Sequence, residues 1–109
     1  MIMELQCLAR DKEGYLTDLD SWTDRVAESL AAETSITLTD AHWVIIRLVR
    51  RFYAETQVVP AMRPLVKLCR SNIQPAEAVN SIYLMELFGE SPAKTIARIA
   101  GLPRPTNCL

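Results

Sequence analysis

The sequence predicts a mostly helical α+β domain in which a small N-terminal β-hairpin packs on about five helices. Three observations support this fold class. Apolar residues recur at helical spacing in several segments, each of which begins at a cap residue or a proline. A polar cluster ending in Gly14 separates two short apolar runs. The last nine residues contain two prolines and no helical pattern, so residues 1–100 are expected to form one domain and residues 101–109 a mobile, flexible C-terminal arm.

The first expected element is the hairpin. Residues 2–8 and the pair Tyr15-Leu16 flank the polar segment 10–14, whose closing glycine is typical of a turn. Because a two-stranded unit of this size is not stable by itself, we expect it to pack on the helices. Cys7 lies in the first strand, where a packed and unreactive thiol is expected.

Two helices are expected after the hairpin. The first ends near residue 32 and has four candidate capping residues, which are Asp18, Asp20, Ser21 and Thr23. The second covers residues 40–56, is capped by Thr39 or Asp40, and carries an apolar stripe at helical spacing. His42 falls in the first turn of this helix. A catalytic role for it would need a partner that the sequence does not supply, so we expect a surface or half-packed imidazole.

The third expected helix covers residues 61–71 and begins near Pro60 or Pro64. Cys69 lies among its apolar positions, where a buried structural thiol is expected. With the preceding helix it forms a helix-turn-helix-like pair. A nucleic-acid function is only weakly supported, because the turn lacks the glycine often found there and the pI near 5.8 is not basic.

Two shorter helices complete the predicted domain. The fourth has two possible starts, at Pro75 or Asn80, and ends at Phe88-Gly89. Ser91 and Pro92 combine a cap with a first-position proline, which predicts a fifth helix as far as residue 100.

The fifth helix ends at Gly101 and carries Lys94 and Arg98 one turn apart on a basic face. This face belongs to the basic half of an asymmetric chain. Residues 1–46 contain three Lys or Arg and nine Asp or Glu, a net charge of −6, whereas residues 47–109 contain nine and four, a net charge of +5. The basic half could steer an acidic protein surface or a phosphate backbone, or could simply be solvated helix faces.

Composition excludes several classes of protein. No apolar run approaches the roughly 20 residues that a membrane span needs, and the N-terminus lacks the basic and apolar regions of a signal peptide, so a cytoplasmic protein is expected. The three cysteines should then be reduced. With no C-x-x-C spacing and one histidine, neither a metal site nor a cofactor is expected.

The C-terminal arm carries the feature that points most directly to function. Pro103 and Pro105 favour extended polyproline geometry, and Cys108 lies one residue from the end of the sequence. In that geometry the segment from Gly101 to Cys108 spans roughly 25 Å, enough to deliver a thiol into a partner's cavity. Sulfur transfer between proteins needs an accessible thiolate that attacks the outer sulfur of a persulfide, and the partner can supply the rest of the site.

Segments distributed over nearly the whole chain resemble one protein family. They are residues 11–16, Trp22, His42-Trp43, residues 49–53, 60–63 and 92–94, and the terminal segment 99–109. On these residues the chain is identified as a member of the DsrC/TusE family, which includes the gamma subunit associated with dissimilatory sulfite reductase and the TusE sulfurtransferase. The resemblance implies a DsrC-like domain with sulfur carried on Cys108.

One position indicates the branch of the family. DsrC proper has a second cysteine eleven residues before the penultimate one, and this sequence has Ala97 there. The chain therefore resembles the single-cysteine, TusE-like branch. That resemblance implies a sulfur relay from a TusBCD-like donor complex to an MnmA-like enzyme that forms 2-thiouridine, with tRNA contacted only through the acceptor.

The residues expected to carry this function follow from the resemblance and from the basic last helix. Cys108 is the catalytic candidate. The candidate partner-docking residues are Gly101, Pro103, Arg104, Pro105, Lys94 and Arg98. Two alternatives remain open. The chain could be a partner or regulator of a sulfite reductase or sulfur-oxidation system that binds without relaying sulfur, or a structural subunit that its arm only tethers.

Overall fold

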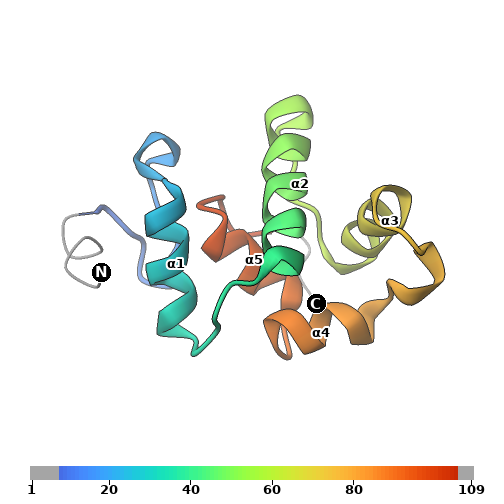
Figure 1. Ribbon diagram of the computed structural model, residues 1–109. Helices are drawn as coiled ribbons and strands as arrows, with labels where there is room; N and C mark the ends of the chain where they lie inside the picture. Colours follow the sequence, from blue (N-terminus) through green and yellow to red (C-terminus); the bar gives the residue numbers. More distant parts are fainter. Residues whose placement is uncertain (1–7, 106–109) are drawn as a thin grey trace.

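The computed structural model describes residues 8–105 (Figure 1). In this part of the chain there are five α-helices: α1 (Asp24–Glu33), α2 (Asp40–Thr56), α3 (Met62–Asn72), α4 (Ser81–Phe88) and α5 (Pro92–Ile99). Two short 3-10 helices, η2 (Leu19–Ser21) and η3 (Ala76–Ala78), precede α1 and α4. The mostly helical fold predicted from the sequence is confirmed, and residues 57–61 join α2 to α3. The helix-turn-helix-like character of this pair stays a prediction.

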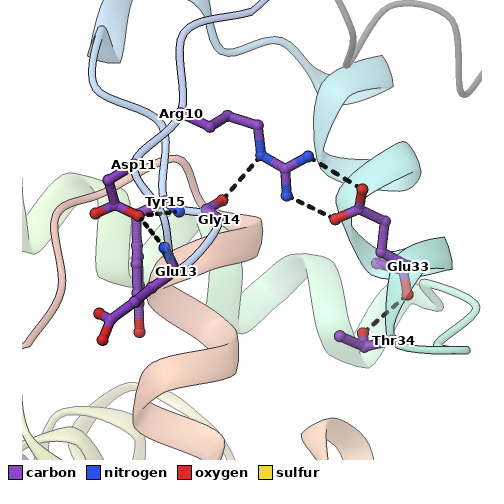
Figure 2. Close-up of polar contacts among 8 residues, drawn as sticks. Arg10, Asp11, Glu13, Gly14, Tyr15, Glu33 and Thr34 are labelled. Atoms are coloured by element: carbon purple, nitrogen blue, oxygen red, sulfur yellow. Dashed lines mark hydrogen bonds and ion pairs between the residues drawn. The ribbon is translucent and has the colours of Figure 1, made fainter.

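The predicted N-terminal hairpin is not supported. Between residues 8 and 105 no strand forms, and one isolated antiparallel bridge joins Arg10 to Leu16, while residues 2–7 lie outside the described part. The Asp11 carboxylate accepts hydrogen bonds from the backbone amides of Glu13 (2.8 Å) and Tyr15 (3.0 Å), which closes a local turn (Figure 2). Tyr15 and Leu16 are consecutive and both buried, whereas a strand would alternate between two faces.

Local capping explains where two of the helices begin. The Thr23 hydroxyl accepts a hydrogen bond from the Val26 amide (3.2 Å) and caps α1. The Asn80 side chain accepts from the Tyr83 amide (2.9 Å) and caps α4. Each cap satisfies an amide that has no partner inside its helix. The later of the two predicted starts of the fourth helix, at Asn80, is therefore the one that the structure uses.

His42 ties the start of α2 to the end of α4. Its Nδ1 accepts a hydrogen bond from the Thr39 amide (3.0 Å), so the ring proton resides on Nε2, which donates to the Leu87 carbonyl (2.7 Å). The ring also meets Phe88 edge to face, with centroids 4.9 Å apart. Only 6% of the residue is exposed, so the expectation of a surface or half-packed imidazole is wrong. The role of His42 is structural.

Helix α5 lies at the centre of the molecule, between α1 and α2 in Figure 1. It packs against each of the other four α-helices of the described chain. Ile96 and Ile99 are fully buried, and the small residues Ala97 and Ala100 let neighbouring elements approach closely. The end of α5, from which the C-terminal arm departs, is therefore held by the core.

Candidate functional site: the base of the C-terminal arm

Gly101 ends α5 and starts the arm. Its φ of +73° is the left-handed conformation that glycine adopts without strain. The Gly101 amide donates to the Arg98 carbonyl (3.2 Å) and the Leu102 amide to the Ala97 carbonyl (2.9 Å). These two bonds form a Schellman motif, the common closure of a helix by glycine. The predicted helix end at Gly101 is confirmed.

Two side chains from distant parts of the sequence also cap α5. The Trp22 indole donates from Nε1 to the Ile99 carbonyl (2.8 Å), and the Arg50 guanidinium donates to the Ala100 carbonyl (2.5 Å). The guanidinium lies 3.8 Å from the Trp22 ring centroid, in cation–π contact. Together these groups satisfy carbonyls that the helix leaves without partners. We refer to Trp22 and Arg50 as the arm clamp.

The packing around the arm clamp changes the pKa of Arg50 and leaves no space for a side chain at Gly101. Burial, and next the nearby Arg47, lower the pKa of the Arg50 guanidinium. A Cβ atom on Gly101 would lie 2.4 Å from Cδ1 of Trp22, well inside van der Waals contact. Gly101 is therefore required both for its backbone conformation and for the close approach of the chain to the indole.

The described part of the arm packs on the body of the protein. Leu102 and Pro105 are buried, whereas Pro103 and Arg104 are exposed. The Arg104 guanidinium contacts both carboxylate oxygens of Glu13, at 2.5 Å and 2.7 Å. Cys108 lies outside the described residues, so its catalytic role and the mobility expected of the arm stay predictions.

Two cavities flank Arg104. One, of about 300 Å³, is lined by Glu13, Tyr15, Lys94, Arg98 and Arg104, and we call it the cationic cavity. The other, of about 430 Å³, is lined by Tyr53, Gln57, Val58, Val59, Pro103 and Arg104.

The two cavities contain four of the six predicted docking residues, and the other two are buried. Lys94, Arg98 and Arg104 meet in the cationic cavity, and Pro103 joins Arg104 in the second one. Gly101 and Pro105 are buried, so in this structure they shape the arm base and present no surface to a partner.

Sequence reasoning did not assign three residues that organise the site: Trp22, Arg50 and Glu13. Trp22, and the segments 11–16 and 49–53 that contain Glu13 and Arg50, resemble the family in sequence, but none of the three was predicted as a site residue. The contacts that define them connect residues 77, 50 and 91 positions apart. No local pattern carries such information.

The single cysteine within residues 8–105, Cys69, has no access to solvent. Cys69 is a free thiol in α3 with no exposed surface, and burial raises its pKa to about 11. The buried structural thiol expected at this position is confirmed, whereas Cys7 lies outside the described residues.

Within residues 8–105, no group of His, Cys, Asp and Glu side chains could hold a metal ion. The same part of the chain contains no helix that is long and apolar enough to cross a membrane.

The fold and the arm base define a small helical domain whose last helix leads into a C-terminal arm, and comparisons identify its family. The family described as "DsrC like protein" matches residues 3–109. The NMR structure of DsrC from Allochromatium vinosum superimposes with a TM-score of 0.85 at 42% identity, over 94% of this chain and 90% of that one. The chain belongs to the DsrC-like family.

Curated relatives carry one recurring name. "Sulfurtransferase TusE homolog" from Haemophilus influenzae is 46% identical over 99 residues, which are 91% of this chain and 90% of the relative. "Sulfurtransferase TusE" from Salmonella typhimurium is 41% identical over 109 residues, which are 100% of this chain and 99% of the relative. The similarity therefore extends through the C-terminal arm.

Proposed function

We propose that this protein is a sulfur-relay protein that carries a persulfide on Cys108. The observation that carries the proposal is the full-length similarity to relatives named sulfurtransferase TusE. The structure of the arm base supports it, because α5 is capped by the arm clamp and leads the chain toward Cys108 from a fixed point. The buried thiol of Cys69 does not compete, since its raised pKa keeps it protonated at neutral pH.

The transfer needs no cofactor. The Cys108 thiolate attacks the outer sulfur of a persulfide on a donor protein. A sulfur–sulfur bond forms on Cys108, the sulfur–sulfur bond of the donor breaks, and the donor cysteine leaves as a thiolate. In the second half of the relay the acceptor's thiolate attacks the outer sulfur on Cys108 in the same way. Each step exchanges one thiolate for another, so no external oxidant or reductant is consumed.

The partners in the proposal are a TusBCD-like donor complex and an MnmA-like enzyme that forms 2-thiouridine in tRNA. Both would meet this chain in the cytoplasm, and tRNA would be bound by the acceptor. From Pro105, where the chain is still packed, three residues extend to Cys108 and span at most about 11 Å. A partner that takes sulfur from Cys108 must therefore approach the arm base closely.

The alternative function, a DsrC-like partner of a sulfite reductase that binds without relaying sulfur, is not favoured. DsrC proper, which this sequence resembles, has a second cysteine at the position of Ala97. The Ala97 side chain is buried in α5. No thiol is available there to pair with Cys108. The recurring sulfurtransferase name among the relatives agrees with a relay that uses a single cysteine.

Mass spectrometry tests the proposal directly. After incubation of the protein with a small inorganic polysulfide, we expect a mass increase of one sulfur atom on the peptide that contains Cys108. The Cys108→Ser variant should gain no sulfur. The Cys69→Ala variant is the matched control and should gain as much as the unmodified protein, because Cys69 is buried and protonated. Equal labelling of Cys108→Ser and the unmodified protein would reject the assignment.

A functional assay tests the downstream step. In cells that depend on this protein, the Cys108→Ser variant should abolish 2-thiouridine in tRNA, measured by chromatography of digested nucleosides. Normal 2-thiouridine with that variant would place the protein outside the thiolation relay.

A further inference from the structure

We propose that the cationic cavity is a docking site for a carboxylate side chain on an acidic surface of the protein's sulfur-transfer partner, and that Glu13 occupies it until the partner binds. The identity of the partner class rests on the proposed function. The existence of the site rests on the geometry of five residues: Glu13, Tyr15, Lys94, Arg98 and Arg104.

The lining of the cavity has more positive charge than it can neutralise. It contains three cations and a single carboxylate. Among residues 8–105, Lys94 makes no ion pair, and the buried Nε of Arg98 has no hydrogen-bond acceptor. A buried charged donor without an acceptor is costly, so an acceptor that reached the Arg98 Nε would remove that cost. The cavity is therefore suited to bind a further anion.

One of the cations, Arg98, packs on the turn that replaces the predicted hairpin. The Arg98 guanidinium lies 5.4 Å from the ring centroid of Tyr15, which is itself buried. The Asp11 carboxylate fixes this turn through the amides of Glu13 and Tyr15. Figure 2 shows the Glu13 carboxylate pointing away from the neighbouring pair of Arg10 and Glu33. Glu13 is thus directed to the arm and not to the side of the turn that faces α1.

The contact between Glu13 and Arg104 indicates the chemistry of the ligand. The Nη1 atom of Arg104 contacts both oxygens of the Glu13 carboxylate, so a carboxylate is a group that this guanidinium binds at the cavity. The two side chains are 44% and 56% exposed, so the pair contributes little to stability and a partner's carboxylate can replace Glu13.

An acidic protein fits this site better than a nucleic acid does. Residues 1–46, to which Glu13 belongs, have a net charge of −6, which repels an extended chain of phosphates more than the few carboxylates of a protein surface. The adjoining cavity on the other side of Arg104 presents Tyr53, Val58 and Pro103, which suit the apolar side chains of a protein partner.

Nuclear magnetic resonance of the full-length, ¹⁵N-labelled protein tests the proposal with defined probes. We titrate a blocked tetraglutamate peptide, its tetraglutamine counterpart and a ten-residue oligouridylate, and follow the side-chain Nε–H signals of Arg98 and Arg104. The acidic peptide should shift both signals and the neutral peptide neither. Glu13→Gln should tighten the binding about threefold or more, because the internal competitor is removed.

Variants distinguish the site from general attraction to positive charge. Lys94→Gln, an exposed position, should weaken tetraglutamate binding about threefold or more, and Arg98→Gln should do the same. Arg51→Gln, a matched cation on α2 outside the cavity, should leave the affinity unchanged. The proposal is overturned if Lys94→Gln and Arg51→Gln have equal effects, if Glu13→Gln does not tighten binding, or if oligouridylate binds the cavity more tightly than tetraglutamate.

This test is independent of the test of the relay itself. Uptake of sulfur by Cys108 from a small polysulfide needs no docking, so it is measured on the unmodified protein in the absence of any peptide. Failure of Cys108 to take up sulfur would reject the proposed function and leave the carboxylate site standing. Normal labelling without peptide binding would reject only the carboxylate site.

Discussion

At the scale of single residues, the environment of each thiol decides whether it can react. Cys69 has no exposed surface, and its burial raises the pKa from an ordinary value of 9.0 to about 11. A thiol that remains protonated is neither a good nucleophile nor easily alkylated. The residue therefore contributes packing to α3, and we expect Cys108 to perform the chemistry.

The shifted pKa of Cys69 predicts how stability depends on pH. Between about pH 9 and 11 the folded protein retains a proton that the unfolded protein has lost. The free energy of unfolding should therefore fall as the pH rises through this interval, by up to about 1.4 kcal/mol per pH unit. Near neutral pH the thiol is protonated in both states and gives no slope. Urea unfolding at a series of pH values measures the effect.

The control for this prediction is Cys69→Ala, which leaves every other titrating group in place. The difference in slope between the two proteins isolates the buried thiol. Identical slopes above pH 9 would show that Cys69 ionises as readily in the folded chain as in the unfolded one. Iodoacetamide at pH 8 gives a second readout, because native Cys69 should remain unmodified until the protein is unfolded.

At the scale of elements, the end of α5 is held by side chains as well as by its own backbone. Backbone closure through Gly101 is reinforced by the indole of Trp22 and the guanidinium of Arg50. The ordinary Schellman motif already satisfies the last turn of a helix. The additional donors fix the direction in which the arm leaves, which matters if Cys108 must enter a partner's site.

Replacement of Trp22 by phenylalanine tests the arm clamp. The ring that Arg50 stacks on is retained, but the Ile99 carbonyl loses its donor. We expect a loss of about 1–2 kcal/mol in the free energy of unfolding and faster hydrogen exchange at the Gly101 and Leu102 amides. Denaturant unfolding and exchange measured by NMR report the two effects.

Trp43→Phe is the matched control. Trp43 is partly buried and stacks with Arg47 at 5.0 Å, yet its indole nitrogen donates to no acceptor among the described residues. It should lose less stability and leave exchange at residues 101 and 102 unchanged. If both tryptophan variants behave alike, the hydrogen bond of Trp22 is not what holds the arm base.

At the scale of the whole molecule, one central helix links the function to the fold. α5 contacts the other four α-helices and also supplies Lys94 and Arg98 to the cationic cavity. A change in its packing is therefore expected to reach the arm. Domains of this size have a total free energy of unfolding of about 5–15 kcal/mol. Truncation of one buried side chain in α5 is therefore expected to remove a large part of it.

Ile99→Ala measures this dependence. Ile99 is fully buried, and its truncation should reduce the free energy of unfolding by about 2–5 kcal/mol through lost burial and a residual cavity. Ile82→Ala, on α4, removes the same atoms from a side chain that is 63% exposed and should change stability by less than about 0.5 kcal/mol. Thermal and urea unfolding provide the comparison, and equal losses would contradict the central position of α5.

The helices could be predicted because their signals are local. Thr23 and Asn80 cap amides three residues away, so the residues that begin a helix lie next to it in the sequence. The hairpin prediction failed because the Asp11 carboxylate accepts the backbone amides of Glu13 and Tyr15. These amides are then not available for hydrogen bonds between two β-strands. A different reason explains why the burial of His42 was not predicted. Its second hydrogen-bond partner, the Leu87 carbonyl, is 45 positions away in the sequence.

The helical fold class, the helix end at Gly101 and the position of Cys108 on the arm follow from the amino-acid sequence, because capping, proline geometry and chain order act over a few residues. Only the tertiary structure decided that Trp22 and Arg50 clamp α5, and that Glu13 meets Arg104 beside Lys94 and Arg98. These contacts join residues that are 50 to 91 positions apart. Their formation depends on how the core packs, which no short segment of the chain specifies.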